Sequence, residues 1–560
     1  MARAADQALK ITPVALRAVP YPQDFDYVIV GAGTAGCVLA ARLSEDPDLQ
    51  VLLIEAGGDG GHPFIHVPAL VGAALAQRDL NWGWRTEPQA ALNGRQIPLP
   101  RGRGLGGTGA VNGMAYFRGQ PQDYDDWAAA GNAGWSWREV LPYFTRSEDN
   151  ADHPASIWHG RGGPIQVAHI RKPNPLNQAF LSAFAALGQY PACDDFNGPR
   201  PEGYGLRQGT IRRGRRDSSA TAYLQPALSR PNLHVLTRHH VSRLLFEGQR
   251  ATGVEVLSPG GMSHIKARRE VLLCAGAIQS PQLLMVSGIG DADELRLHGL
   301  PLVQHLPAVG RHYQDHVAVP VLMETRDTRS YGLSWRTAHR AAANLAQYLL
   351  WREGPLASNL FESTAFIRSH AGADRPDLQI VFQPARRNRS SFPLPLGHGY
   401  AINSVTLYPH SRGRISLASG DSHVAPRIQA NLLADDADLQ PLLTGIKLAR
   451  QLLADSAFAS CRAVEVAPGP QVQGDAALTA YIRASASTVH HPTSTCLMGP
   501  GEDSVVDAQL RVHGIQGLRV IDASVFPGII GGNTNAPVVM VAEKAADLLR
   551  GLPPPAPAPI

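Results

Sequence analysis

Residues 26–57 read DYVIVGAGTAGCVLAARLSEDPDLQVLLIEAG, and this stretch decides the fold of the first part of the chain. Tyr27–Val30 is a short apolar run, typical of a fully buried strand. A helix of small residues is predicted from about Thr34 to Ser44, and Val51–Ile54 predicts a second buried strand that Glu55 closes. Strand, turn, helix, strand and acid in this order indicate a dinucleotide-binding βαβ unit. The turn has the pattern G-x-G-x-x-G, formed by Gly31, Gly33 and Gly36.

Each part of this unit has a physical role in holding a dinucleotide. Gly31 permits the tight turn, Gly33 leaves room for a pyrophosphate against the backbone, and Gly36 lets the helix pack closely on the sheet. The helix N-terminus directs N–H groups and the positive end of its dipole at the phosphate. Glu55 follows at nearly the spacing, roughly 20 residues, expected of an acid that binds ribose hydroxyls, and it favours FAD or NAD over NADP. A βαβ unit without a nucleotide is the alternative, because such motifs give false positives.

The composition describes a globular protein of more than one domain. With 560 residues, 44% hydrophobic and 18% charged, the chain is too long for one core and too apolar to be disordered. The net charge of +4 is spread along the chain, so no nucleic acid is implied as a partner. The five cysteines are widely spaced, which argues against a disulfide framework and against a zinc site, so no metal is expected.

The chain shows neither the apolar core of a secretory signal nor a run of about 20 apolar residues suited to a membrane span. We therefore expect a cytoplasmic protein, with peripheral attachment to a membrane left open. The sequence does not predict the oligomeric state.

Glycine-rich turns at strand ends occur in the first and last parts of the chain and are absent between them, which predicts a discontinuous first domain. Residues 1–23 read as a flexible lead-in, and residues 24–316 contain glycine-rich turns at strand ends. Residues 317–480 lack such units and mix helices with strand-like runs, which suits a substrate-binding domain built on an antiparallel sheet with helices. Residues 481–551 return to glycine-rich segments that complete the first domain, and residues 552–560 form a Pro-rich tail expected to be extended and exposed. The predicted fold class is α/β, or α+β overall, with a Rossmann-like FAD-binding domain and that second domain.

Three further segments have the composition of a binding or catalytic site. Arg101–Asn112, RGRGLGGTGAVN, is a second glycine-dense loop that can bring backbone close to a bulky group. Ser487–Gly499 holds two adjacent histidines before a proline, and Gly531–Lys544 holds a polar Asn-Thr-Asn turn before a helix. On residue type alone, ordinary packing explains a histidine pair at least as well as catalysis does, and the same holds for His316.

Read together, these segments resemble the glucose–methanol–choline (GMC) family of flavoprotein oxidoreductases, over about Asp24–Gly551. Besides residues 26–57, the resemblance rests on stretches in the family's order: RGRGLGGTGAVNGMAYFRGQPQDYDDW at 101–127, GAIQSPQLLMVSGIG at 276–290, VGRHYQDH at 309–316, HHPTSTCLMG at 490–499 and VIDASVFPGIIGGNTNAPVVMVAEKAADLL at 520–549. The texture is similar to bacterial members of the choline dehydrogenase and L-sorbose dehydrogenase type.

The resemblance implies oxidation of a primary or secondary alcohol or a polyol. His491 matches the family's active-site histidine, whose neutral imidazole accepts the hydroxyl proton while hydride passes to flavin N5, giving an aldehyde or ketone. Asn533 matches the second catalytic position and is expected to orient the substrate oxygen. The cofactor-binding residues expected on this basis are Gly31, Gly33, Thr34, Ala35, Gly36, Glu55, Ala56, Arg103, Gly107, Thr108, Asn112, Gly113, Ala115, Val241, Ala275, Asp522, Ala523, Asn533 and Thr534.

The chain departs from the family pattern at three places. The family's usual GGSS is GGTG at Gly106–Gly109, which keeps one hydroxyl and loses the next. Members that bind flavin covalently through a histidine carry it where this chain has Val111, so FAD is expected to be non-covalent. His490 stands where relatives often have tyrosine and is expected to pack or hydrogen-bond beside the base. Ser358–Glu362 is predicted, on position alone, to form one wall of the substrate pocket.

Several functions stay open on this basis. An oxidase would pass electrons to oxygen and produce hydrogen peroxide, whereas a dehydrogenase would pass them to a quinone or a dye-like carrier. A flavin-containing lyase on the same fold would do no net redox chemistry. A flavin-binding protein without turnover is disfavoured, because both His491 and Asn533 are present.

Overall fold

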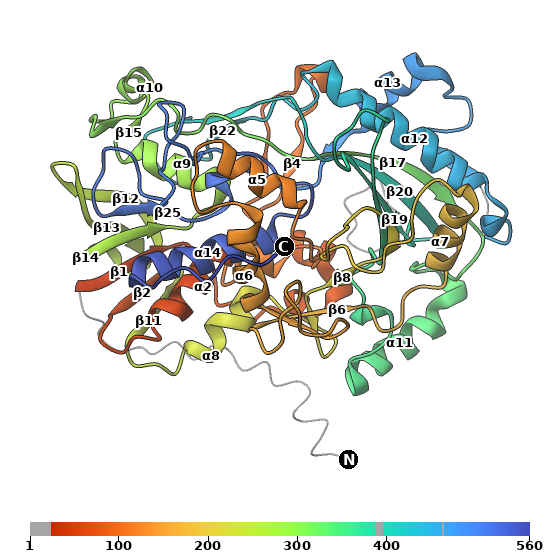
Figure 1. Cartoon of the computed structure of the whole chain (residues 1–560), viewed down its shortest axis with the longest axis horizontal. Helices are drawn as coiled ribbons and strands as arrows, with labels where there is room; N and C mark the ends of the chain where they lie inside the picture. The colour runs from red at the N-terminus through yellow and green to blue at the C-terminus, as the bar shows by residue number, and fades with distance from the viewer. Residues whose placement is uncertain (1–23, 387–395, 462–463) are drawn as a thin grey trace.

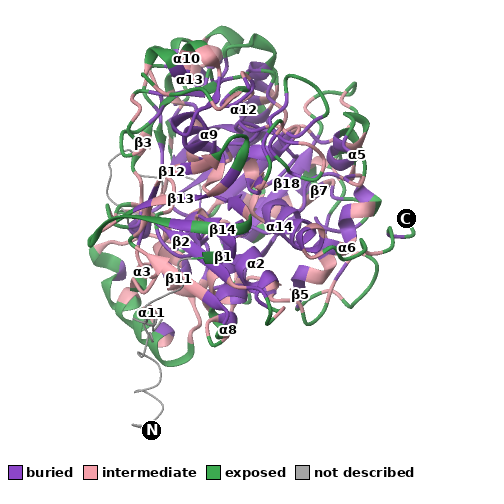
Figure 2. Cartoon of the chain, turned by 90° about the vertical axis from the view of Figure 1, so that its left-hand side faces the viewer, coloured by how far each residue is buried: buried purple, intermediate pink, exposed green. Residues whose placement is uncertain are grey.

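The computed structural model describes residues 24–386, 396–461 and 464–560, so the expected lead-in at residues 1–23 lies outside the described residues. Two sheets organise the chain, one on the left of Figure 1 and one on the right. Buried residues fill β1 and α2 in the interior, whereas the first part of β14 is exposed (Figure 2).

The first sheet has the strand order β11-β2-β1-β14-β13-β12, and β25 also pairs with β14. The strands around β1 are parallel, while β13 and β12 form an antiparallel extension. Parallel strands are covered on both faces, which explains why β1 and β2 read as continuous apolar runs. Their bounds are β1 Asp24–Val30, β2 Val51–Glu55, β11 Leu233–Thr237, β12 His240–Glu247, β13 Arg250–Ser258, β14 Gly261–Leu273 and β25 Leu518–Val520.

Two helices from opposite ends of the chain pack together beside this sheet: α2 (Thr34–Leu43) and α14 (Asn535–Arg550). The Tyr27 hydroxyl of β1 donates to the carbonyl of Leu549, 3.1 Å away, and Arg42 of α2 pairs with the buried carboxylate of Glu543 at 2.8 Å. A side chain at Gly36 would collide with the carbonyl of Gly31, so close packing of α2 on the turn requires a glycine. Because α14 and β25 come from the C-terminal part, the first sheet and its helices are assembled from both ends of the chain.

The second sheet is antiparallel, with the order β23-β17-β20-β19-β18-β7 and with β24 also paired to β17. The helix α12 (Leu439–Ala454) packs against β20, and α7 (Leu176–Leu187) also contacts β7 and β18. One face of the sheet therefore lies against helices and the other is left for the cavity described below. The strand bounds are β7 Gly203–Leu206, β17 Val317–Glu324, β18 Ser363–Ile367, β19 Leu378–Gln383, β20 Gly399–Thr406, β23 Val464–Ala467 and β24 Ser487–Thr488.

The remaining longer helices lie around these two layers. They are α5 Pro121–Ala129, α6 Trp137–Ser147, α9 Gly276–Val286, α10 Ala292–Leu297, α11 Ala338–Trp351 and α13 Gly474–Ser485. Over the described residues, no helix has both the length and the apolarity needed to cross a bilayer.

The predicted fold class is confirmed, since a parallel-led Rossmann-like sheet and an antiparallel sheet with helices are both present. The tail at residues 552–560 is extended, but the expectation that it is exposed is wrong at Ala558. That residue is buried: its N–H donates to the Arg138 carbonyl of α6 at 2.8 Å, and its carbonyl accepts from Arg138 Nε at 3.1 Å. These two hydrogen bonds hold the end of the chain against α6.

Candidate active site

One cavity of about 550 Å³ lies between the two sheets. It is lined by both glycine loops, by β19 and β20 of the second sheet, and by the two C-terminal segments that carry His491 and Asn533. Of the residues predicted to bind the cofactor or act in catalysis, all line this cavity except Gly36 and Arg103. Gly36 lies in the packing between α2 and its turn, and the Arg103 guanidinium lies over the Trp82 ring, 4.8 Å from its centre. The structure thus brings residues separated by most of the chain into one site.

The two glycine loops contact each other at the cavity. A Cβ on Gly107 would lie 2.8 Å from Gly33 Cα, so the loops touch backbone to backbone at a residue with φ +50°. A Cβ on Gly31 would meet the Cys274 carbonyl at 2.7 Å, whereas one on Gly33 would find its nearest atom only at 3.8 Å. Protein packing accounts for glycine at residues 31 and 107, while residue 33 leaves open space at the helix N-terminus, where a pyrophosphate fits.

Glu55 ties these loops together with its carboxylate. Oε2 accepts the N–H of Ala32 at 2.9 Å, and Oε1 accepts the N–H groups of Gly57 and Gly104 at 2.8 and 3.0 Å. Burial raises the pKa of Glu55, and these three hydrogen bonds act against that rise. Glu55 therefore holds the loop geometry, and its predicted contact with ribose hydroxyls stays a prediction.

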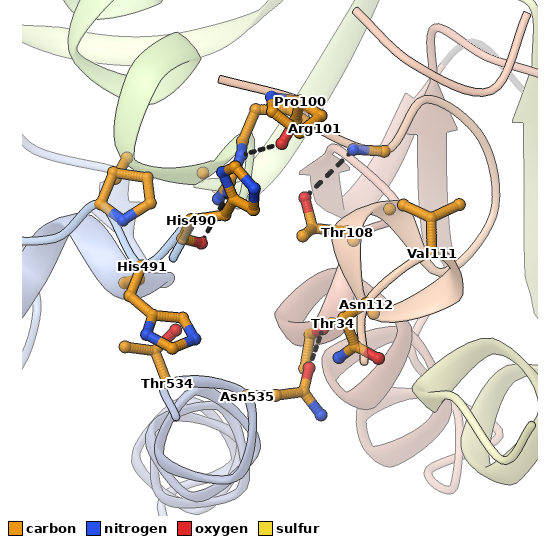
Figure 3. A pocket seen from close by; sticks show the side chains of 18 of the residues that line it. Thr34, Pro100, Arg101, Thr108, Val111, Asn112, His490, His491, Thr534 and Asn535 are labelled. Carbon is orange, nitrogen blue, oxygen red and sulfur yellow. Dashed lines mark hydrogen bonds between the residues drawn. The ribbon is translucent and has the colours of Figure 1, made fainter. Parts of the chain in front are cut away.

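Helix α14 begins at the same cavity, next to the N-terminus of α2. Thr34 at the start of α2 donates its hydroxyl to Asn535 Oδ1 at 2.8 Å, which joins the N-termini of two helices at the cavity (Figure 3). Asp522 is held by Ser280, whose hydroxyl donates at 2.6 Å, and by the N–H of Gly276 at 2.8 Å. Two helix N-termini facing one cavity favour bound negative charge, as a diphosphate or a reduced flavin carries.

His491 is held in one tautomer by His316. The Nε2 atom of His316 lies 3.0 Å from the Ile530 carbonyl, which can only accept, so Nε2 carries the hydrogen. Burial lowers the pKa of His316 to about 4, so the ring is neutral and its Nδ1 is an acceptor. That Nδ1 lies 2.9 Å from His491 Nδ1, which therefore donates. His491 consequently presents an unprotonated Nε2.

This Nε2 atom is also the part of His491 that meets Asn533. The Asn533 Nδ2 lies 3.0 Å from His491 Nε2 and donates to it. Burial, followed by the neighbours His316, Arg101 and His490, holds the pKa of His491 well below its usual range. Both His491 and Thr534, the residue before α14, line the cavity and are labelled in Figure 3. A neutral base and an amide donor thus converge on one point of the cavity.

Asp315 holds the backbone around the histidine pair by hydrogen bonds. Its Oδ1 accepts the His491 N–H at 2.8 Å, and its Oδ2 accepts the hydroxyls of Tyr313, at 3.0 Å, and Thr488. Arg101, whose burial lowers its pKa, donates through Nη2 to the His490 carbonyl at 2.6 Å (Figure 3). These contacts explain how His490 can be held at φ +70°, a conformation that is uncommon for a residue other than glycine.

Sequence reasoning missed part of this arrangement. His316 was assigned to ordinary packing, although the stretch VGRHYQDH that contains it was part of the family resemblance. Arg101 and Asn535 line the cavity and were not predicted as site residues. In the predicted wall Ser358–Glu362, Phe361 alone lines the cavity; the Glu362 carboxylate instead accepts from the Asn174 N–H, at 2.7 Å, and from Ser358. His490 lines the cavity, and its expected packing or hydrogen-bonding role beside the base stays a prediction.

Comparisons with known proteins agree with this site. Two family models, both described as GMC oxidoreductase, match residues 25–318 and 409–542. An "Alcohol dehydrogenase [acceptor]" of Pseudomonas putida is 39% identical over 527 residues, covering 94% of this chain and 95% of that protein. An "Oxygen-dependent choline dehydrogenase 1" of Chromohalobacter salexigens is 41% identical over 545 residues, covering 96% of each chain. The crystal structure of a pyridoxine 4-oxidase named as from Mesorbium loti superimposes with a TM-score of 0.85 at 34% identity, covering 94% of this chain and 99% of that one.

FAD is the cofactor of this family, and the residues present fit it. The open space at Gly33, the acid at Glu55 and the second glycine loop fit a dinucleotide, and His491 lines the same cavity. With both sheets, the two glycine loops and the histidine–asparagine pair in place, and with family models matched over most of its length, the chain belongs to the GMC oxidoreductase family.

Proposed function

We propose that this chain oxidises an alcohol to an aldehyde or a ketone, with non-covalent FAD as its oxidant. The observation that carries the proposal is the lone pair of His491 Nε2, held towards the cavity by His316 and placed beside the amide of Asn533. The names of the relatives, an alcohol dehydrogenase and a choline dehydrogenase, support this reading. Val111 in place of a linking histidine supports non-covalent binding.

The chain's own residues handle the proton and the oxygen. The substrate hydroxyl gives its proton to His491 Nε2, and the resulting imidazolium goes on donating from Nδ1 to His316, now as a stronger, charge-assisted hydrogen bond. The Asn533 amide, which donates to His491 in the resting site, turns its N–H to the substrate oxygen and stabilises the charge that develops there. Bound FAD supplies the acceptor for the hydride from the carbinol carbon.

The wall of the cavity next to this base is electrically neutral over most of its area. Alternation along β19 places Gln379, Val381 and Gln383 on the face towards the cavity, and β20 adds Asn403 and Val405. Strand β17 sets Ala318 opposite Val405, and its pairing with β24 leads to the histidine pair. We call these six residues the substrate floor. Its apolar members pack with Phe361 and Val489.

Among the described residues that line the cavity wall, Arg207 is the charged side chain next to the substrate floor. It is 6% exposed, its Nε donates to the Phe361 carbonyl, and its guanidinium lies 5.5 Å from the centre of the Phe361 ring. No hydrogen bond from its terminal nitrogens to another described residue is present. Burial lowers the pKa of Arg207 to about 9, so the group is charged at neutral pH. It offers an unused donor pair to a ligand.

This arrangement disfavours a quaternary ammonium substrate. Such cations are recognised by open aromatic faces or by carboxylates. Here the rings of Phe361 and Trp82 already carry the guanidinium groups of Arg207 and Arg103, and Trp84, which also lines the cavity, is stacked on Trp82. The Glu362 carboxylate is engaged in hydrogen bonds with residues outside the cavity lining. We therefore propose a neutral alcohol, or one with a carboxylate distant from its hydroxyl, in place of choline.

The test is anaerobic reduction of the flavin, followed by loss of absorbance near ~450 nm. Primary alkanols, hydroxy acids and hydroxyalkyl trimethylammonium ions of matched chain length are compared. We expect the hydroxy acid to reduce the flavin best, because its carboxylate gains a charge-assisted hydrogen bond from Arg207. The ammonium ion should reduce the flavin at least about tenfold less efficiently than the alkanol, because the Arg207 guanidinium repels its charge. No bleaching by any alcohol overturns the proposed function.

A variant separates the substrate class from the activity itself. Arg207→Met should remove the preference among the three series while alkanols still reduce the flavin. Gln383→Met, a neutral change on the same floor, should leave the preference in place. Equal efficiencies for all three series in the wild-type protein would refute the substrate class and leave alcohol oxidation standing. Reoxidation of the reduced flavin by oxygen or by a quinone then decides between oxidase and dehydrogenase.

A further inference from the structure

Helix α11 turns apolar side chains towards solvent. Its inner side carries Tyr348, which is buried and donates its hydroxyl to the Gly214 carbonyl at 3.1 Å. Its outer side carries alanines and leucines, and Leu345, Leu349 and Leu350 are 50%, 40% and 64% exposed. A surface helix usually shows the reverse pattern, with charged residues outward. The helix lies along the lower right edge of the molecule in Figure 1.

Two tryptophans stand at the ends of this surface. Trp335, just before the helix, is 87% exposed, and Trp351, its last residue, is 66% exposed. We call these two rings and the three leucines the α11 apolar face. Large exposed apolar side chains gathered on one helix indicate an interaction site, and tryptophan favours the boundary between water and hydrocarbon.

The border of the α11 apolar face is basic. Residues 335–352 contain three arginines and no acid. Arg336 and Arg340 are exposed and donate to the Arg326 carbonyl and the Thr328 hydroxyl, both at 3.3 Å, which leaves their charges uncompensated by these contacts. The acids on either side are engaged elsewhere, Asp327 with Arg329 and Glu353 with Lys172. The surface therefore combines apolar area with positive charge.

We propose that the α11 apolar face docks onto the surface of an anionic phospholipid bilayer, with the helix lying in the interface. An apolar side, tryptophans and a basic border are the features of a helix that lies in this way. A second copy of the chain fits the same face less well, because a two-fold contact would bring the basic borders of both copies together.

Docking on this face would bring the bilayer near one wall of the active-site cavity. The turn that follows α11, Pro355–Ala357, contacts the turn Pro68–Leu70. The residues after that turn, Val71, Gly72 and Leu75, line the cavity. A lipid-soluble alcohol or electron acceptor would then have a short path between membrane and flavin.

The experiment is flotation of the flavin-loaded full chain with vesicles of phosphatidylcholine, with or without about 30% phosphatidylglycerol. We expect binding to the anionic vesicles that weakens as salt is raised. The double variant Leu349→Ser/Leu350→Ser should bind roughly 10- to 30-fold more weakly, because two exposed leucines no longer leave water. The control is Leu297→Ser on α10, where a leucine that is 83% exposed should make no difference.

Several results would overturn the proposal. One is absence of flotation, and another is equal loss in the double variant and in Leu297→Ser. A third is a double variant that changes a dimer into a monomer by size exclusion with no effect on flotation, which would assign the face to a second copy. A chain lacking residues 1–23 should float as the full chain does; stronger flotation on deletion would show that this segment covers the face. Flavin reduction by alcohol should be the same in all variants.

Discussion

Replacing His316 tests whether this residue sets the tautomer of the base. In His316→Leu, the Nδ1–H of His491 loses the acceptor that lies 2.9 Å away, and a buried donor without a partner costs about 1–3 kcal/mol. The cost raises the free energy of the tautomer whose Nε2 is unprotonated. The fraction of molecules whose His491 can accept a proton at Nε2 therefore drops by roughly 5- to 150-fold. The imidazolium formed in the reaction also loses its charge-assisted partner. We expect flavin reduction to slow by about 10- to 100-fold.

His316→Asn is the matched control. Its side-chain oxygen can take the place of the ring Nδ1 and accept from His491, while the contact of ring Nε2 with the Ile530 carbonyl is lost in both variants. The Asn variant should therefore recover most of the rate that the Leu variant loses. The measurement is anaerobic stopped-flow reduction at saturating alcohol, with flavin content checked for each protein. Equal rates in the Leu variant and the wild-type protein, or equal loss in both variants, would refute the assignment.

Four more perturbations test the rest of the site. His491→Ala should keep its flavin and reduce it roughly 10²–10⁴-fold more slowly in stopped flow, and an unchanged rate would show that another group is the base. Because the pKa of His491 is lowered, its active neutral form should persist as the pH falls below about 6.5, so the reduction rate should stay level there; a decline centred near pH 6.5 would contradict this. Glu55→Gln should lower the free energy of unfolding by about 2–4 kcal/mol and release flavin, because its amide nitrogen would face backbone N–H donors; denaturant titration measures it. Gly107→Ala should lose flavin, since its Cβ would lie 2.8 Å from the adjoining loop, whereas Gly528→Ala, with open space around it, should bind flavin normally.

The first βαβ unit could be predicted from sequence because its signals are local. Gly36 is required by the carbonyl of Gly31, five residues before it, and an apolar run beside a glycine turn indicates a buried strand wherever it occurs. The assignment of residues 481–551 to the first domain could also be predicted, because these residues again contain glycine-rich segments at strand ends. Such features depend on neighbours within a few residues, so the sequence holds the information directly.

Long-range pairings could not be predicted in the same way. The role of His316 depends on a ring nitrogen of His491 and a carbonyl at Ile530, both far along the chain, and a lone histidine carries no signal of either. Arg207 lies in a sequence of ordinary polarity, and its position beside the substrate floor appears only once β7 pairs with β18. The buried Ala558 shows the same limit, because a Pro-rich tail gives no indication of the helix that it meets.

The closure of the first domain by α14 has a consequence for how the protein is made. A ribosome releases α2 early, but the helix that covers it, and Glu543 that pairs with Arg42, emerge only at the end of synthesis. Until then the surface of α2 that α14 covers stays exposed, and exposed apolar surface makes a growing chain prone to aggregation. A product that stops before residue 535 lacks the helix and the Asn535 contact to Thr34, so quality control should remove it. Activity in a cell therefore reports completed chains alone.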